Sequence, residues 1–131
     1  MLDCFDTESS RDNHGITWNT ARNHAAWKLY LGENYASGDV SPWASPSRET
    51  DYSGLPPCYT FVLDGEAVLD ETLAYVESLR AAGVPAEADI YRGSVHAFDL
   101  LTAWTEEAKK ARLVFREKSS ALIRKYVTEG E

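Results

Sequence analysis

The sequence is short of cysteine, of basic charge and of long hydrophobic runs, and each shortage excludes a class of protein. Its two cysteines, Cys4 and Cys58, are too few for a disulfide-stapled secreted scaffold and lack zinc-site spacing, so we expect reduced, partly buried thiols. The 13 basic residues stand against 21 acidic ones, and the net charge of −8 disfavours non-specific binding to nucleic acid or an anionic membrane. No apolar run approaches the roughly 20 residues that cross a bilayer, so no membrane span is predicted.

Signals for export and for metal binding are missing as well. Residues 1–8 lack the basic and then apolar layout of a secretion signal, which favours a cytoplasmic location. His14 and His24 have no paired ligand spacing, and neither a metal nor any other cofactor is predicted. What the chain does contain is typical of a folded protein, because 44% of its residues are hydrophobic and four are tryptophan. A length of 131 residues corresponds to one domain with a sizeable core.

The most informative pattern lies between Leu55 and Asp99, where two short strands flank a helix. Residues 58–63 and 86–91 are the strands, and residues 71–82 have helical spacing, with Asp70 expected to cap the first turn. A helix between two such strands fits a right-handed crossover, so the strands are predicted to be parallel.

The other segments are predicted from their periodicity and their breakers. Two more helices are expected, over residues 20–31 and 105–127. Residues 7–12 are expected to form a loop, and residues 33–57 a long irregular connection that Tyr35, Trp43 and Tyr52 pack down.

Chemistry-bearing side chains follow both predicted strands. Asp64 and Glu66 come after the first strand, and His96 comes after the second. Because functional groups collect beyond the carboxyl ends of parallel strands, the carboxylates and the imidazole are expected side by side. A carboxylate on one imidazole nitrogen fixes the tautomer and leaves the other nitrogen free to act as a base. The pair is therefore an acid–base relay that lacks a nucleophile.

Several segments together resemble the hormone-sensitive-lipase-like esterases of the α/β-hydrolase superfamily. They are Leu-Pro-Pro over residues 55–57, Leu-Arg-Ala-Ala-Gly-Val-Pro over 79–85 and Arg-Gly-Ser-Val-His-Ala-Phe-Asp over 92–99, with Met-Leu-Asp over 1–3, Trp-Lys-Leu-Tyr-Leu-Gly over 27–32 and Val-Ser-Pro-Trp-Ala over 40–44 upstream. The resemblance covers nearly the whole chain and matches the C-terminal part of these enzymes. It implies an α/β class with a partial α/β-hydrolase fold, in which a short parallel sheet has flanking helices and a long C-terminal helix. Within one domain over 1–131, residues 1–54 are then a cap-proximal segment with the irregular connection, and residues 55–131 carry the acid and the histidine.

The resemblance assigns roles to individual residues. His96 matches the catalytic histidine of the family, and Glu66 stands where the catalytic acid is usually an aspartate in Gly-x-x-Asp-Pro. The glycine and proline positions of that turn are Leu63 and Ala67 here, so the acid turn departs from the pattern twice, and Asp64 is the fallback acid. Cys4 stands where these enzymes usually carry an acidic residue, and Asp70 matches an acidic residue at the start of the following helix. The region around Trp27 helps to build the acyl-pocket cap in the family, which makes Trp27 a candidate substrate contact.

The nucleophile of these esterases has no counterpart in the chain. It lies in Gly-x-Ser-x-Gly on a strand-to-helix turn, upstream of the acid and the histidine. The residues two places after each glycine include neither serine nor cysteine; they are Thr17, Asn34, Val40, Pro56, Ala67, Pro85 and Val95. Substitutes considered are Ser94 in the histidine loop, Ser41 and Ser53 in the irregular connection, and Cys4, which is the best nucleophile among them once activated.

Two functions remain open at this point. In the first, the chain is the C-terminal part of a carboxylic ester hydrolase, inactive alone, and a small ester is the substrate once the site is completed. In the second, it is a non-catalytic remnant or an oligomerising interaction module that keeps the fold. Because an exposed strand edge recruits partners, we expect a homo-oligomer or a complementing N-terminal polypeptide, unless residues 1–3 cover that edge.

Overall fold

The fold is described here from a computed structural model, which describes residues 6–35 and 39–128. The expectations for Cys4 and for residues 1–3 fall outside these ranges. The elements, in chain order, are α1 (Glu8–Arg11), α2 (Thr20–Leu31), η1 (Gly32–Tyr35), η2 (Pro46–Arg48), β1 (Cys58–Leu63), α3 (Leu69–Ala81), β2 (Ala86–Tyr91), α4 (Phe98–Leu101), α5 (Glu106–Ile123) and η3 (Arg124–Thr128).

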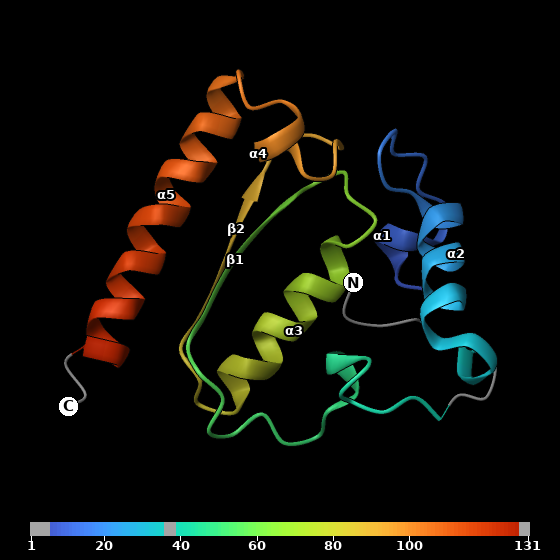
Figure 1. Cartoon of the computed structure of the whole chain (residues 1–131), viewed down its shortest axis with the longest axis horizontal. Helices are drawn as coiled ribbons and strands as arrows, with labels where there is room; N and C mark the ends of the chain where they lie inside the picture. The colour runs from blue at the N-terminus through green and yellow to red at the C-terminus, as the bar shows by residue number, and fades with distance from the viewer. Residues whose placement is uncertain (1–5, 36–38, 129–131) are drawn as a thin grey trace.

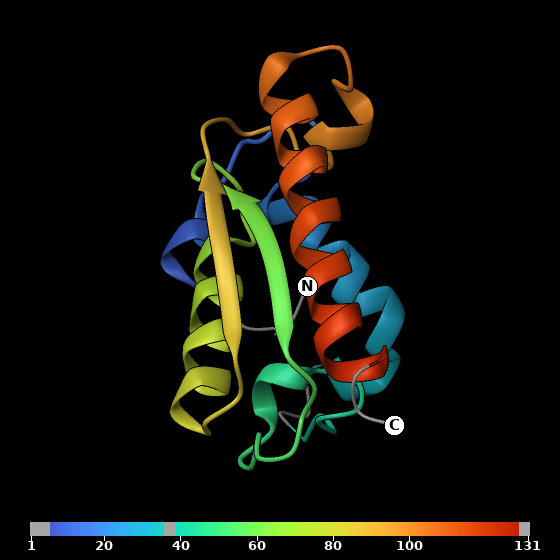
Figure 2. The ribbon, with the colours of Figure 1, turned by 90° about the vertical axis from the view of Figure 1, so that its left-hand side faces the viewer.

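Two parallel strands form the centre of the molecule. β1 and β2 pair from Cys58 opposite Ala86 to Leu63 opposite Tyr91, which confirms both predicted strands and their direction. Figures 1 and 2 show α3 against one face of this sheet and α5 against the other, with α1 and α2 beyond α3. The architecture is the predicted α/β class, with a short parallel sheet, flanking helices and a long C-terminal helix.

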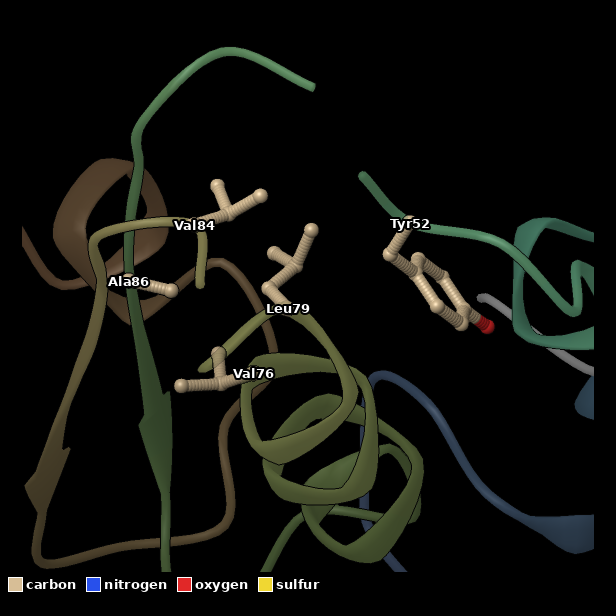
Figure 3. Packing of buried hydrophobic residues seen from close by; sticks show 5 residues of the cluster. All are labelled: Tyr52, Val76, Leu79, Val84 and Ala86. Atoms are coloured by element: carbon tan, nitrogen blue, oxygen red, sulfur yellow. The ribbon is translucent and has the colours of Figure 1, made fainter. Parts of the chain in front are cut away.

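Alternation along the strands produces a separate core on each face. On the α3 side, Val76 and Leu79 pack against Val84 and Ala86, and the buried ring of Tyr52 closes the cluster (Figure 3). The helical spacing predicted for residues 71–82 is thus confirmed, because Val76 and Leu79 share the buried face of α3.

The core on the α5 side lies under the carboxyl ends of the strands. Leu63, at the end of β1, packs with Phe98 and with two fully buried alanines of α5, Ala108 and Ala111. Because alanine has a small side chain, α5 lies close to the strand that carries the acid turn. The ring of Phe61 meets the ring of Phe98 edge-on at a centroid distance of 5.7 Å.

The outer edge of β1 has no strand beside it in the described ranges. The amide of Asp64 donates to the carbonyl of Tyr91 at 2.9 Å, so even-numbered residues of β1 face β2. The backbone groups of Tyr59 and Phe61 therefore point away from the pair, and no backbone group within residues 6–35 and 39–128 pairs with them.

Local sequence signals set the ends of the long helices. α2 has the predicted bounds, because the side chain of Asn19 accepts from the amide of Arg22 at one end and Gly32 adopts a φ of 56° at the other. The hydroxyl of Thr105 accepts from the amide of Ala108 and starts α5, which continues as the η3 turn.

Two local predictions are wrong. Residues 7–12 contain the short helix α1 rather than a loop, and Asp70 does not cap its own helix. The start of α1 is closed locally, because the amide of Thr7 donates to the hydroxyl of Ser10 at 2.8 Å. The carboxylate of Asp70 accepts from the amide of Ser9 in α1 at 2.7 Å, and the hydroxyl of Ser9 accepts from the amide of Asp70 at 3.1 Å, so Asp70 joins two helices instead of capping its own.

Contrary to the prediction from the sequence, the aromatic residues of the irregular connection are not all packed against the protein. Tyr52 is buried, and Tyr35 packs against a cluster of Trp27 and Val40. Trp43 is 97% exposed, so it does not pack the connection down. Trp104, just before α5, is exposed too. None of the helices in the described ranges combines the length and the hydrophobicity that crossing a bilayer requires.

Candidate active site

The acid turn after β1 and the histidine loop after β2 lie against each other. The amide of Gly65 donates to the carbonyl of Gly93 at 2.8 Å, which continues the strand pairing beyond the sheet. A Cβ at position 65 would lie 2.7 Å from that carbonyl oxygen and 3.0 Å from the Cβ of Ser94. Glycine at this position therefore allows the two loops to approach as closely as they do.

This approach brings Glu66 and His96 together. Nδ1 of His96 lies 3.3 Å from Oε1 of Glu66, whose side chain is 8% exposed. The two groups are within ion-pair distance but lack the geometry of a hydrogen bond. Nδ1 itself is buried. The His96 side chain as a whole is 44% exposed. Nδ1 contributes none of that exposure, so the exposed surface belongs to the other atoms of the side chain.

The carboxylate changes the acid–base behaviour of the imidazole. The pKa of His96 is raised, chiefly by the adjacent carboxylate of Glu66, while burial acts in the opposite direction. Asp99 makes a smaller contribution that also raises the pKa of His96. The arrangement therefore stabilises the imidazolium, which a histidine needs when it accepts a proton during a reaction.

Asp64 has a different place from Glu66. Its carboxylate is exposed and accepts from the amide of Gly93 at 2.9 Å, so it holds the backbone of the histidine loop. The structure thus places Glu66, and not the fallback Asp64, beside the imidazole. The catalytic roles of Glu66 and His96 stay predictions.

A third segment, between α1 and α2, touches both loops, and sequence reasoning missed it. The amide nitrogen Nδ2 of Asn13 donates to the carbonyl of Gly65 at 3.1 Å, and the hydroxyl of Thr17 donates to the carbonyl of His96 at 3.3 Å. The ring of Trp18 lies 5.7 Å from the ring of His96, centroid to centroid, at an interplanar angle of 38°. No local pattern could have found these contacts, because Thr17 and His96 are 79 residues apart in sequence.

The remaining candidates lie apart from this pair. Trp27 is 1% exposed in the cluster with Val40, and its contact with a substrate stays a prediction. Ser94 is exposed in the histidine loop, and within the described ranges no hydroxyl or thiol is hydrogen-bonded to the His96 imidazole. In the same ranges no three histidine, cysteine, aspartate or glutamate side chains gather closely enough to hold a metal ion.

A carboxylate and an imidazole presented from the ends of neighbouring parallel strands are the acid–base part of a hydrolase site of the α/β-hydrolase kind. The sequence pattern of the family described as alpha/beta hydrolase fold matches residues 1–100, and the chain belongs to this family, in its hormone-sensitive-lipase-like branch.

Known relatives with similar sequences are esterases. An esterase of Acinetobacter venetianus is 33% identical over 98 residues, which are 75% of this chain and 31% of the relative. The esterase LipI of Mycobacterium tuberculosis is 30% identical over 93 residues, which are 68% of this chain and 29% of the relative. The chain thus spans about a third of the length of these proteins.

Solved structures with a similar fold include esterases as well. The esterase LipW of Mycobacterium marinum superposes with a TM-score of 0.78 at 25% identity, over 97% of this chain and 38% of that protein. An esterase of Pyrobaculum calidifontis gives a TM-score of 0.74 at 28% identity, over 92% of this chain and 40% of that protein.

Proposed function

We propose that this chain supplies the acid and the histidine of a carboxylic ester hydrolase, and that the nucleophilic serine comes from a Gly-x-Ser-x-Gly segment outside residues 1–131, which is called the partner below. The observation that carries the proposal is the 3.3 Å contact between Glu66 and His96 at the carboxyl ends of two parallel strands. The esterases among its relatives support the same reaction class.

In the reaction, the serine hydroxyl of the partner attacks the ester carbonyl. His96 accepts the hydroxyl proton through the ring nitrogen that does not face Glu66 and returns it to the departing alcohol, which leaves an acyl-enzyme. Water then attacks the acyl group, with His96 again accepting and returning a proton. Glu66 stabilises the imidazolium in both steps, because its carboxylate faces the buried Nδ1.

The open edge of β1 is the place where we expect the partner to bind. The outward backbone groups of Tyr59 and Phe61 offer hydrogen bonds to one more strand, in the manner of strand addition. The occupant that fits is a polypeptide with a Gly-x-Ser-x-Gly turn, since the match covers only 31% and 29% of the length of the two relatives. A second copy of the chain is the competing occupant. Sedimentation of the purified chain at micromolar concentration distinguishes a self-associating protein from one that waits for its partner.

The test of this function is a search for the nucleophile followed by a labelling reaction. We expect the DNA beside the gene to encode a segment with Gly-x-Ser-x-Gly, and a fluorophosphonate probe to label its serine when both polypeptides are mixed. Labelling should fall in the presence of His96→Gln in place of the wild-type chain. If no such segment exists, or if the labelling of its serine does not depend on His96, the chain is not half of an esterase site.

One observation favours a second candidate, a non-catalytic module. The chain contains no Gly-x-Ser-x-Gly turn of its own, so it can keep the fold without any chemistry. The same labelling experiment separates the two functions, because the module predicts that the chain binds its partner without changing the reactivity of any serine.

A further inference from the structure

The ring of His96 needs a support that neither its own loop nor Glu66 provides. Ala97, the next residue, adopts a left-handed conformation with a φ of 59°, which other contacts must hold in place. The contact from Nδ1 to Glu66 lacks hydrogen-bond alignment, so it attracts the imidazole without fixing the plane of the ring.

The segment from Asn13 to Thr20 is held in shape by its own hydrogen bonds. The hydroxyl of Thr20 accepts from the amide of Asn13 at 2.7 Å and donates to the carbonyl of Ser10 at 2.5 Å. Nδ2 of Asn19 donates to the carbonyl of Gly15 at 3.1 Å, while the same side chain caps α2. The segment is therefore a rigid support that does not depend on the histidine loop for its shape.

Trp18 is fixed on this support from the side of α2. Its indole N–H donates to Oδ1 of Asn23 at 3.3 Å, and Asn23 is only 3% exposed. The indole ring of Trp18 lies beside the imidazole of His96, and Thr17 donates to the backbone carbonyl of the same histidine. A line of contacts thus runs from a buried polar side chain of α2 to the candidate base.

We propose that Trp18 is a positioning residue, whose indole packs against the His96 ring and holds it in the orientation that directs Nδ1 at Glu66. The imidazole is then held between a carboxylate that supplies charge and an aromatic face that supplies orientation. The ring nitrogen that does not face Glu66 keeps a fixed direction toward the site where the serine arrives. The consequence for hydrolysis rests on the proposed function, whereas the contact and its effect on His96 do not.

The test uses the chain alone and reads His96 directly. Protonated imidazole quenches the fluorescence of an indole that it touches, so emission should fall as the pH drops through the titration of His96. Trp18→Phe should abolish this pH-dependent fall but leave the His96 titration in proton NMR close to that of the wild type, since a phenyl ring keeps the packing. Trp18→Ala should move the pKa of His96 toward its ordinary value, because the contact with Glu66 is its largest perturbing influence.

Trp43→Phe is the matched control, since Trp43 is 97% exposed and lies in the connection before η2, outside the acid turn and the histidine loop. It should leave both the fluorescence fall and the NMR titration unchanged. The proposal is overturned if the fluorescence fall survives Trp18→Phe. It is equally overturned if folded Trp18→Ala titrates at His96 like the wild type, since a purely structural tryptophan would lower stability alone. The wild-type and Trp18→Phe titrations decide the contact even if Trp18→Ala does not fold. The two proposals can fail separately. If the fluorescence and NMR titrations agree with the positioning role but His96→Gln leaves serine labelling unchanged, the proposed function is refuted and the positioning role is not.

Discussion

Gly65 controls the distance between the acid turn and the histidine loop, and Gly65→Ala tests this control. The added Cβ would lie 2.7 Å from the carbonyl oxygen of Gly93, whereas ordinary contact begins at 3.4 Å, so the loops must separate by about 0.7 Å. The same movement would carry the 3.3 Å contact between Glu66 and His96 to about 4 Å, the limit of an ion pair. Overpacking of this kind costs about 1–3 kcal/mol in the free energy of unfolding.

Two assays on the purified variant read these effects. Urea unfolding gives the loss of stability, and proton NMR follows the titration of the His96 ring. We expect the pKa of His96 to fall toward its ordinary value in Gly65→Ala, because the carboxylate of Glu66 is the main cause of its elevation. The reasoning is refuted if the variant keeps its unfolding free energy within about 0.5 kcal/mol and His96 titrates as in the wild type.

Gly54→Ala is a matched control for backbone strain. Gly54 has a φ of 71° and no atom within 4 Å of the added Cβ, so alanine there costs about 1 kcal/mol through its conformation alone. Since Gly54 lies in the irregular connection before β1, the titration of His96 should not change. A comparable loss of stability without a change at His96 then shows that the effect of Gly65→Ala is local to the two loops.

Three further predictions concern the same loops and the helix behind them. Glu66→Gln should lower the pKa of His96, which is raised in the folded state. The pair therefore stabilises the fold below about pH 6.5, and this stabilisation is lost as the pH rises through the folded-state pKa. The variant should lose more unfolding free energy in urea at pH 5 than at pH 9. Equal losses at the two pH values would contradict it. Leu63→Ala should cost about 2–5 kcal/mol, because Leu63 is 1% exposed under the acid turn, and a loss below about 1 kcal/mol in urea unfolding would show that the site collapses around the deletion. Thr105→Ala should cost about 1 kcal/mol by removing the cap of α5, and Thr105→Ser should restore most of it in thermal unfolding; a serine variant as unstable as the alanine variant would exclude the cap as the cause.

Elements governed by local chemistry could be predicted from the sequence. The bounds of β1, β2 and α2 follow from apolar runs, a capping asparagine and a glycine at the helix end, and the structure has the same bounds. The meeting of Glu66 and His96 was also predictable, because parallel strands bring their carboxyl ends to one side of the sheet.

What could not be predicted depends on contacts between distant residues. Asp70 does not cap its own helix because its carboxylate accepts from the amide of Ser9, 61 residues away. The contact between Trp18 and His96 could not be predicted either, since nothing in the segment around Trp18 indicates that it faces the histidine. Trp43 was expected to be buried by its type alone, but its position in the connection leaves it exposed.

The measurement that tests the central claim most directly is the rate of p-nitrophenyl butyrate hydrolysis by the chain mixed with a polypeptide that carries the nucleophilic serine. The account predicts no hydrolysis by the chain alone and hydrolysis by the mixture. It also predicts a loss of about 10³-fold or more when His96→Gln replaces the wild-type chain. A smaller loss is expected for Glu66→Gln, since its amide keeps the shape but not the charge. Hydrolysis by the chain alone, or an unchanged rate with His96→Gln, would contradict the account.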